Sequence, residues 1–460
     1  MRSIDLRILF AASCGLGLAL VLSGCTSARA PAVDCHIGAY RLADGRIVDI
    51  APISDPGGLR WRLPDGRTGR LARANDGTWA STLGWTGRPD GVRVAFGECG
   101  ANRMAYDRSE GERLAFDVID TTFEGAGVAL AGRLVLPKGD GPVPIVVEVH
   151  GSEDYSARVF NTRQRTFPAH GIGVFVYDKR GTGGSGGRYS QDFGLLSDDA
   201  VAALHEARRL AGARAGRVGF GGGSQAGWVA PLAASKAAVD FVAIGYGLAD
   251  SPLAEDRDQV MRELRAVGHG PDVLAKAREV TDATGEVIAS GFKQGFDRLD
   301  AVRDKYKGEP WWQDLGGEFT GELVKYPEVA LRLVGPMRDQ GTSWRHDPMP
   351  VLRGLQAPQL WVLAGADSEA PPEETRRRLL ALAAEGRPIT TVEFPDTDHG
   401  IVEFEIAADG SRLDTREADG YFRLLVDWIK DGRLDDAGYG AAQVLSPPGA
   451  PSTPATPALL

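Results

Sequence analysis

The chain has few of the residues that hold metals and redox groups. It contains 4 cysteines and 7 histidines among 460 residues, and none of them has the spacing of a metal site. A P-loop spacing is also missing, as is a basic stripe with interleaved aromatic residues, and the net charge is −10. We therefore expect no metal, no organic cofactor and no nucleic-acid partner.

Long apolar runs are missing after the first residues. The run from Ile8 to Leu22 suits the core of a signal peptide and is short for a membrane-spanning helix, and no later stretch approaches about 18 apolar residues. It ends in Leu22-Ser-Gly-Cys25, which resembles the lipobox of bacterial lipoproteins. That resemblance implies cleavage after residue 24, a membrane anchor on Cys25 and, because Thr26 follows rather than aspartate, an outer membrane location facing the periplasm. The alternative is ordinary secretory cleavage nearby, with Cys25 incidental.

Two cysteines remain for the folded part of an exported chain. Cys14 would leave with the signal peptide and Cys25 would carry lipid, so Cys35 and Cys99 form an even pair in an oxidising compartment. We expect a disulfide between them. Two free buried thiols are the alternative.

Residues 35–110 follow a linker at residues 25–34 and predict a small all-β domain. Short alternating segments are interrupted by Asp-Gly pairs at residues 44–45, 65–66 and 90–91. An Asp-Gly pair between alternating apolar residues is a strong hairpin signal. No residue in this domain suggests catalysis.

Residues 115–432 change to strands that alternate with helices, which predicts a mostly parallel sheet covered on both faces. Ser197 can cap a helix whose inner face carries small and apolar residues, and a final amphipathic helix should stop near Gly432. The tail at residues 436–460 is rich in Pro, Ala, Ser and Thr, which predicts disorder. The expected strands lie at residues 143–150, 173–178, 217–224, 241–245, 359–365 and 389–394.

Residues 251–352 contain no expected strand. Apolar residues keep helical spacing there and aromatic residues supply bulk. We expect a helical insertion that covers the carboxyl edge of the sheet as a lid. The alternative is a helical elaboration that packs elsewhere.

Ser224 is the first candidate for a catalytic residue. An apolar run enters Gly221-Gly-Gly-Ser224, and a helix-like stretch follows at once. A strand, a sharp turn and a helix with serine at the bend form a nucleophile elbow. The glycines let the strained turn form and leave the approach to the hydroxyl open.

A nucleophilic serine needs a base, and the base needs an orienting acid. His399 follows the last predicted strand, where a loop can aim its imidazole at the elbow. Asp367 lies on the loop at the carboxyl end of the preceding strand, where sites in parallel sheets collect. Glu369 is its rival, whereas Asp396 and Asp398 are too near His399 in the chain to reach behind the ring.

The order Ser224, Asp367, His399 resembles that of the alpha/beta-hydrolase superfamily. His150-Gly-Ser152 resembles its oxyanion-hole loop, residues 177–185 resemble its Asp-x-Arg-Gly-x-Gly-x-Ser segment, and residues 223–228 resemble the elbow of its esterase and serine-aminopeptidase-like members. The resemblance covers about residues 115–432 and implies oxyanion donors from the backbone amides of Ser152 and Gln225. Ala226 departs from the pattern, since it replaces the last glycine of Gly-x-Ser-x-Gly.

Two similar motifs lie in one loop and do not fit their usual context. Ser185 in Gly183-Gly-Ser-Gly-Gly187 matches Gly-x-Ser-x-Gly, but no strand enters it and no helix follows. The same glycines fit Gly-x-Gly-x-x-Gly, which needs a helix opening at the glycines to bind a dinucleotide. We therefore expect neither a second elbow nor a dinucleotide site.

These features together predict a lipid-anchored serine hydrolase that acts on a small-molecule acyl substrate through an acyl-enzyme on Ser224. A carboxylic ester is the expected substrate, because no acidic cluster in residues 251–352 is clearly placed to bind a substrate amine. The alternatives are a serine aminopeptidase-like peptidase of the same fold and a non-catalytic ligand-binding lipoprotein. The oligomeric state is left open.

Overall fold

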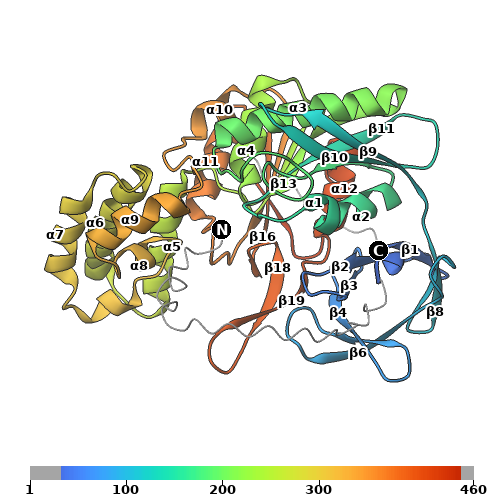
Figure 1. Cartoon of the computed structure of the whole chain (residues 1–460), viewed down its shortest axis with the longest axis horizontal. Helices are drawn as coiled ribbons and strands as arrows, with labels where there is room; N and C mark the ends of the chain where they lie inside the picture. Colours follow the sequence, from blue (N-terminus) through green and yellow to red (C-terminus); the bar gives the residue numbers. More distant parts are fainter. Residues whose placement is uncertain (1–32, 447–460) are drawn as a thin grey trace, which may run out of the picture.

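The computed structural model describes residues 33–446, which form a β-barrel, a large sheet with helices on both faces, and a helical insertion (Figure 1). The predicted signal peptide, the lipidation site at Cys25 and residues 25–32 of the predicted linker lie outside the described residues. Within residues 33–446, no helix combines the length and the apolar character that a membrane crossing requires.

The barrel is formed by eight antiparallel strands in chain order, and β8 closes onto β1. Side chains alternate along each strand, so that Val48, Ile50, Leu59 and Trp61 fill the barrel core. This confirms the predicted small all-β domain. Its strands are β1 (Gly38–Leu42), β2 (Ile47–Pro52), β3 (Leu59–Arg62), β4 (Thr68–Arg73), β5 (Trp79–Thr82), β6 (Pro89–Phe96), β7 (Arg103–Tyr106) and β8 (Ser109–Arg113).

Two of the three Asp-Gly pairs form the expected turns. Residues 44–45 join β1 to β2, and residues 65–66 join β3 to β4. The third prediction was wrong, because Asp90 and Gly91 lie inside β6. The pairing of β5 with β6 shifts register between Ala80 and Thr82, and Gly91 has φ +83°, so its left-handed conformation accompanies an irregularity within the ladder rather than a turn.

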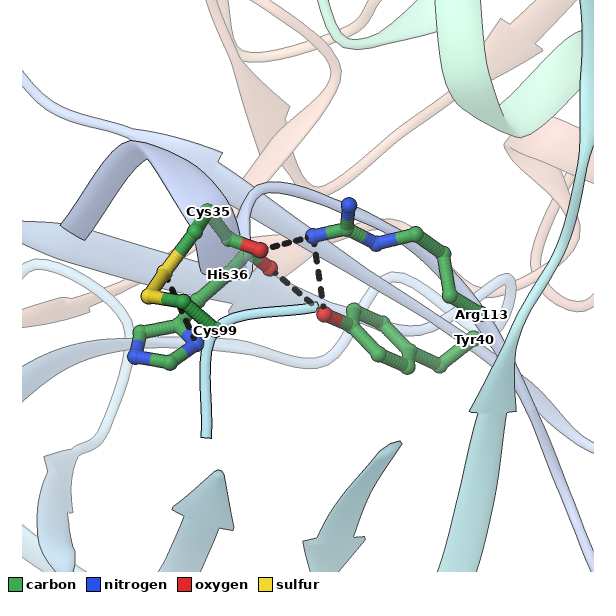
Figure 2. Close-up of a disulfide and its surroundings, with 5 residues drawn as sticks. All are labelled: Cys35, His36, Tyr40, Cys99 and Arg113. Carbon is green, nitrogen blue, oxygen red and sulfur yellow. Dashed lines mark hydrogen bonds between the residues drawn. A yellow bond between two sulfur atoms is a disulfide. The ribbon is translucent and has the colours of Figure 1, made fainter. Parts of the chain in front are cut away.

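The predicted disulfide between Cys35 and Cys99 is confirmed (Figure 2). Cys35 lies in a short 3-10 helix (Val33–His36) before β1, Cys99 follows β6, and their Cα atoms are 5.5 Å apart. Arg113 donates a hydrogen bond to the carbonyl oxygen of Cys35, and Tyr40 Oη donates to the carbonyl oxygen of His36 at 2.9 Å. The disulfide joins the segment before β1 to the segment after β6, and the two hydrogen bonds hold that first segment against β1 and β8.

The main sheet has nine strands in the order β20-β16-β15-β14-β13-β11-β12-β10-β9. The six strands from β16 to β12 are parallel, whereas β9, β10 and β20 pair antiparallel. This is the predicted sheet. Its strands are β9 (Phe116–Glu124), β10 (Ala129–Pro137), β11 (Val143–Val149), β12 (Gly173–Tyr177), β13 (Ala215–Gly223), β14 (Val242–Gly245), β15 (Gln359–Ala364), β16 (Ile389–Phe394) and β20 (Gln443–Leu445).

Helices cover both faces of this sheet, and each face has its own apolar core. One core contains apolar side chains of α3, α4 and α11, and the other contains those of α2 and α12. The expected fold class is therefore confirmed. The helices are α1 (Ala157–Phe160), α2 (Arg163–Ala169), α3 (Phe193–Ala211), α4 (Ala226–Lys236), α10 (Met349–Gly354), α11 (Glu373–Ala384) and α12 (Tyr421–Asp431), and Gly432 ends α12 in the left-handed conformation as predicted.

Two local predictions were wrong. Ser197 does not cap a helix, because α3 begins four residues earlier with Asp192 as its cap, and Ser197 Oγ donates to the carbonyl oxygen of Gly194 inside the helix. The predicted disordered tail is ordered as far as residue 446. Tyr439 is buried against α12, and β20 adds a strand beside β16. Residues 447–460 lie outside the described part.

The helical insertion leaves the sheet after β14 and returns before β15, at the carboxyl edge (Figure 1). It has an apolar core of its own, with Leu264, Phe296, Trp311 and Phe319 among its members. Its elements are α5 (Pro252–Ala266), α6 (Pro271–Ala289), α7 (Phe296–Tyr306), a 3-10 helix η4 (Pro310–Asp314), α8 (Thr320–Leu323) and α9 (Glu328–Arg338).

A small antiparallel sheet links the part that contains the nine-stranded sheet to the barrel, and it was not expected from the sequence. It consists of β17 (Thr397–Asp398), β18 (Val402–Ile406) and β19 (Arg412–Glu417). The backbone of Glu417 donates to the carbonyl oxygen of Gly66, and Trp85 donates to that of Asp414, so β19 lies against the barrel (Figure 1). The segment that follows residue 399 is therefore tied directly to the barrel.

The disulfide should be a major stabiliser of the barrel. Closing a loop with a sequence separation of 64 residues contributes about 4 kcal/mol in the chain-entropy treatment. We expect the double variant Cys35→Ser/Cys99→Ser to lose about that free energy of unfolding, measured by denaturant titration of the barrel's tryptophan fluorescence. Reductant should destabilise the wild type and leave the double variant unchanged. Equal stability of the two oxidised proteins would contradict this assignment.

Candidate active site

Ser224 lies at a sharp turn between β13 and α4, as the elbow motif predicted. Its φ is +54°, a left-handed conformation that a non-glycine residue adopts only when its surroundings enforce it. The surroundings are tight, since a Cβ at Gly222 would be 2.2 Å from the carbonyl oxygen of Val149 and one at Gly223 would be 2.2 Å from Tyr246 Cζ. Only glycine fits at these two positions, and Ser224 Oγ makes no hydrogen bond within residues 33–446.

Asp367 and His399 are joined by a hydrogen bond of 2.9 Å between Oδ2 and Nδ1. Asp367 is 1% exposed, and its other oxygen accepts hydrogen bonds from the backbone amides of Glu369 and Ala370 at 3.0 and 2.7 Å. Adjacent parallel strands β15 and β16 end at the same edge, which brings the two loops together. A carboxylate held this way orients the imidazole so that Nε2 faces the site.

His399 carries a raised pKa. Burial by itself would lower it, but the Asp367 carboxylate and, less strongly, Glu369 raise the pKa of His399 to about 9. Glu369 does not replace Asp367 behind the ring, because its Oε1 lies 3.9 Å from Nε2 on the opposite side. The imidazole is thus placed between two carboxylates.

Asp398 holds the loop that carries His399 and was not identified as a site residue from the sequence. Its Oδ1 accepts from the backbone amides of Ser368 and His399 at 2.7 and 2.9 Å, and Arg412 on β19 pairs with Oδ2 at 2.5 Å. Burial would raise the pKa of Asp398, but these bonds hold it below its usual value. The sequence analysis placed Asp398 beside His399 in a loop, but it did not identify Arg412 as the partner of Asp398.

Ser224 and His399 both lie at the carboxyl edge of the main sheet, but no hydrogen bond joins them. Within residues 33–446 no hydrogen bond joins Ser224 Oγ to the imidazole. Tyr246 lies between the two loops: its ring packs edge-on against His399 with centroids 4.9 Å apart, and the Ser224 amide donates to the carbonyl oxygen of Gly245 at 3.1 Å. A shift of either side chain therefore has to precede proton transfer between them.

The backbone amides of Ser152 and Gln225 are both available as donors. Neither N–H donates a hydrogen bond within the described part of the chain. Gln225 is the N-cap residue of α4, so its amide also lies at the positive end of that helix. Amides without another acceptor are the kind of donor that an oxyanion hole uses.

Lys179 supports the loop that carries Ser152. Its Nζ donates a hydrogen bond of 2.6 Å to the carbonyl oxygen of Gly151, which belongs to the same peptide unit as the Ser152 amide. Burial lowers the pKa of Lys179 to about 8. The contact fixes the plane of that peptide and directs its N–H away from the lysine. Tyr189 Oη donates to the next carbonyl oxygen, that of Ser152.

Ser185, in the other Gly-x-Ser-x-Gly motif, has a structural role. Its Oγ donates to the carbonyl oxygen of Asp178 at 2.6 Å and accepts from the amide of Ala131 at 2.9 Å. No helix follows it, in agreement with the sequence analysis.

Three buried or half-buried glutamates lie near His399, and the sequence analysis missed them as a group. Glu255 comes from α5, Glu318 from the loop before α8, and Glu369 from the loop after β15. Burial, together with the neighbouring Glu318 carboxylate, raises the pKa of Glu255 to about 8, and burial raises that of Glu318 to about 7. Glu255 Oε2 has no hydrogen-bond partner. The two insertion residues thus place carboxyl groups within electrostatic range of the imidazole.

The residues near the site do not form a metal centre. In the described ranges, the group of ligand-type residues close enough to share a metal ion is Cys35, His36 and Cys99. Its two sulfur atoms are bonded to each other and cannot act as thiolate ligands.

Solved structures similar to this chain include hydrolases of several kinds. An acylaminoacyl peptidase of Pyrococcus horikoshii is 13% identical with a TM-score of 0.40, and the match covers 77% of this chain and 52% of the peptidase, so the chain spans about half its length. An esterase of Pyrococcus furiosus is 14% identical (TM-score 0.38; 62% of this chain, 85% of the esterase). An esterase of Pyrobaculum calidifontis is 16% identical (TM-score 0.37; 62% and 77%).

A search of the curated proteins finds no match to the sequence. A family match does exist, and it extends over residues 126–377, more than half of the chain. It includes Ser152, Ser224 and Asp367, and His399 follows it. The chain therefore belongs to the family described as X-Pro dipeptidyl-peptidase (S15 family).

Proposed function

We propose that the protein cleaves an acyl bond through an acyl-enzyme formed on Ser224. His399 accepts the proton of the Ser224 hydroxyl as it attacks the carbonyl carbon, and then donates that proton to the leaving group. Asp367 holds the ring with Nδ1–H bound, which leaves Nε2 to act as base. The 2.9 Å bond between Asp367 and His399 is the observation that carries the proposal.

The attack requires Ser224 Oγ and His399 Nε2 to come within hydrogen-bond reach. Catalytic hydrogen bonds are often long before substrate binds and shorten in the complex. Ser224 Oγ is not committed to another partner, so a side-chain rotation is enough to bring it toward the ring. The strained turn supports the proposal because such conformations concentrate at functional sites.

The negative charge that develops on the carbonyl oxygen would be bound by the amides of Ser152 and Gln225. Each donor in such a site contributes roughly 3 to 4 kcal/mol to transition-state stabilisation. Lys179 would act on this step as a positioning residue, because it holds the peptide unit that contains the Ser152 amide. Water then attacks the acyl-enzyme with His399 again acting as base.

We further propose that the acyl part of the substrate carries a free amino group, as in an aminopeptidase. The ester preference inferred from the sequence depended on the lack of an acidic cluster in the insertion. The carboxyl groups of Glu255 and Glu318 lie near His399, together with Glu369. Binding of an ammonium group would offset the cost of burying these carboxylates. The family description agrees with a peptide substrate.

We also propose the lipid anchor on Cys25 and an outer membrane location facing the periplasm, as the lipobox-like segment implies. The disulfide between Cys35 and Cys99 supports export, since disulfides persist in oxidising compartments.

Ser224→Ala should abolish turnover and leave the melting temperature nearly unchanged, because Oγ makes no hydrogen bond in the free protein. A fluorophosphonate probe should label the wild type and not this variant. Ser185→Ala is the matched control, and it should keep the labelling. Absence of labelling that depends on Ser224 would favour the non-catalytic ligand-binding alternative.

The double variant Glu255→Gln/Glu318→Gln should lose about 10- to 100-fold in kcat/KM on aminoacyl amides, the range expected for loss of a charge-assisted hydrogen bond. Its kcat/KM on a neutral butyrate ester should stay within about twofold of wild type, since that substrate has no amine to bind. Glu279→Gln, an exposed insertion glutamate paired with Lys305, is the control. Faster wild-type turnover of esters than of aminoacyl amides, unchanged by these substitutions, would restore the esterase interpretation.

The pH dependence should report the raised pKa of His399. The base must be neutral, so kcat/KM on a neutral ester should rise with pH and level off only above about 9. Asp367→Asn removes the carboxylate that raises this pKa, so the rising limb should move to lower pH while the plateau falls by about 10³ to 10⁴. The profiles are measured by initial rates from pH 5 to 10. A rising limb at the same pH in both proteins would contradict the assigned pair.

A further inference from the structure

The cavity between the barrel and the hydrolase part lies beside the proposed active site. It has a volume of about 320 Å³, within reach of the small-molecule range of roughly 300 to 1,000 Å³. The hydrolase side contributes Gly151 of the oxyanion loop, Gly223 before the nucleophile and Gly400 after the base. The barrel side contributes Arg62 and Leu63. The cavity therefore joins the barrel to all three loops of the site.

Alternation along β3 directs Arg62 into this cavity. Leu59, Trp61 and Leu63 belong to the barrel core, so Arg62 lies on the outer face, toward the hydrolase part. Its guanidinium has no hydrogen-bond or ion-pair partner within residues 33–446, although most of the side chain is removed from solvent. Burial lowers the pKa of Arg62, against the weaker opposite effect of Glu417.

Two carboxylates that line the cavity with Arg62, one on β2 and one on β11, are paired with arginines of α2. Asp49, its partner across β2, is 1% exposed and accepts two hydrogen bonds from Arg165 at 2.6 and 3.1 Å. Glu148 pairs with Arg163 at 3.3 Å. Arg62 therefore differs from the two other arginines of this interface, each of which has a carboxylate.

Two further acids line the cavity. Glu417 lies in electrostatic range of Arg62 but forms no ion pair with it, and Glu153 lies against Gly151 at the oxyanion loop. Neither satisfies the guanidinium. Arg62 is half-buried, lines the cavity, is charged at every physiological pH and has no protein acceptor in the described part of the chain, so it is placed to bind a ligand that supplies one.

We propose that Arg62 binds the free C-terminal carboxylate of a short peptide whose leaving portion occupies this cavity. A planar guanidinium presents parallel N–H donors that match the two oxygens of a carboxylate. This inference rests on the proposed function and extends it: the insertion acids receive the amino end of the substrate, and the barrel receives the carboxyl end. The barrel thereby selects short peptides with both termini free.

Binding to the inactive protein tests the proposal without requiring turnover. Calorimetry with full-length Ser224→Ala compares Ala-Ala-Ala with its C-terminal amide, which differs only in the carboxylate. We expect the free acid to bind about 10- to 100-fold more tightly, the range for a charge-assisted hydrogen bond. Adding Arg62→Gln should reduce that preference to about onefold while leaving the affinity for the amide unchanged. Arg70→Gln, an exposed barrel arginine paired with Asp55, is the control and should keep the preference.

The results that overturn the proposal are distinct from those that overturn the proposed function. Equal affinity for acid and amide, absence of binding by both, or a preference that survives Arg62→Gln would each remove the carboxylate site. Equal loss of both ligands in Arg62→Gln would assign the residue a structural role and also overturn the proposal. Fluorophosphonate labelling of Ser224 is read separately, so an active serine without a carboxylate preference rejects this inference alone.

Discussion

The hydrogen bond between Asp367 and His399 is the contact around which the site is organised. It joins two loops that are 32 residues apart in the chain and meet because β15 and β16 are adjacent and parallel. The carboxylate is buried and has its second oxygen bound by two backbone amides, so it cannot rotate away from the ring. The orientation and the raised pKa of the imidazole follow from this arrangement.

The barrel and the helical insertion both contact the loops that carry Asp367 and His399. After His399 the chain forms β18 and β19, which lie against the barrel, and Arg412 on β19 pairs with Asp398 beside the imidazole. The helical insertion approaches from the other side and places Glu255 near the ring. Both additions thus act on the loops of the hydrolase sheet, and neither supplies the proposed nucleophile or base.

The charged groups that are removed from solvent differ in whether they have a partner. Most buried charges are paired, as in the contacts of Arg165 with Asp49 and of Arg180 with Asp199. Glu255 and Arg62 are exceptions, one with an unpartnered oxygen and one with an unpartnered guanidinium. A polar group that lacks a protein partner can be completed by a ligand that supplies one. The opposite signs of Glu255 and Arg62 on two sides of the site suit a ligand with a charged group at each end.

The sequence alone was enough to predict the elements whose signal is local. The elbow at Ser224 is a strand, a glycine cluster and a helix in direct succession, and the disulfide was predicted from the two cysteines that remain if the chain is exported as a lipoprotein. The end of α12 at Gly432 was equally clear. Ser197 failed as a cap because Asp192, five residues before it, caps α3 instead. Asp90-Gly91 failed because an irregular strand uses the same residues as a turn.

Tertiary structure decided which distant side chains meet. Nothing in the chain around Glu255, Glu318 or Arg62 distinguishes these residues from solvent-exposed charges, because burial and the absence of a partner depend on what packs against them. The sequence determined the fold class and the residues proposed for the chemistry, through periodicity and turn chemistry that act over a few positions. The positions of Glu255, Glu318 and Arg62 around the site depend on how the insertion and the barrel pack against the sheet. Their electrostatic environment therefore follows from three-dimensional packing and could not be predicted from the sequence.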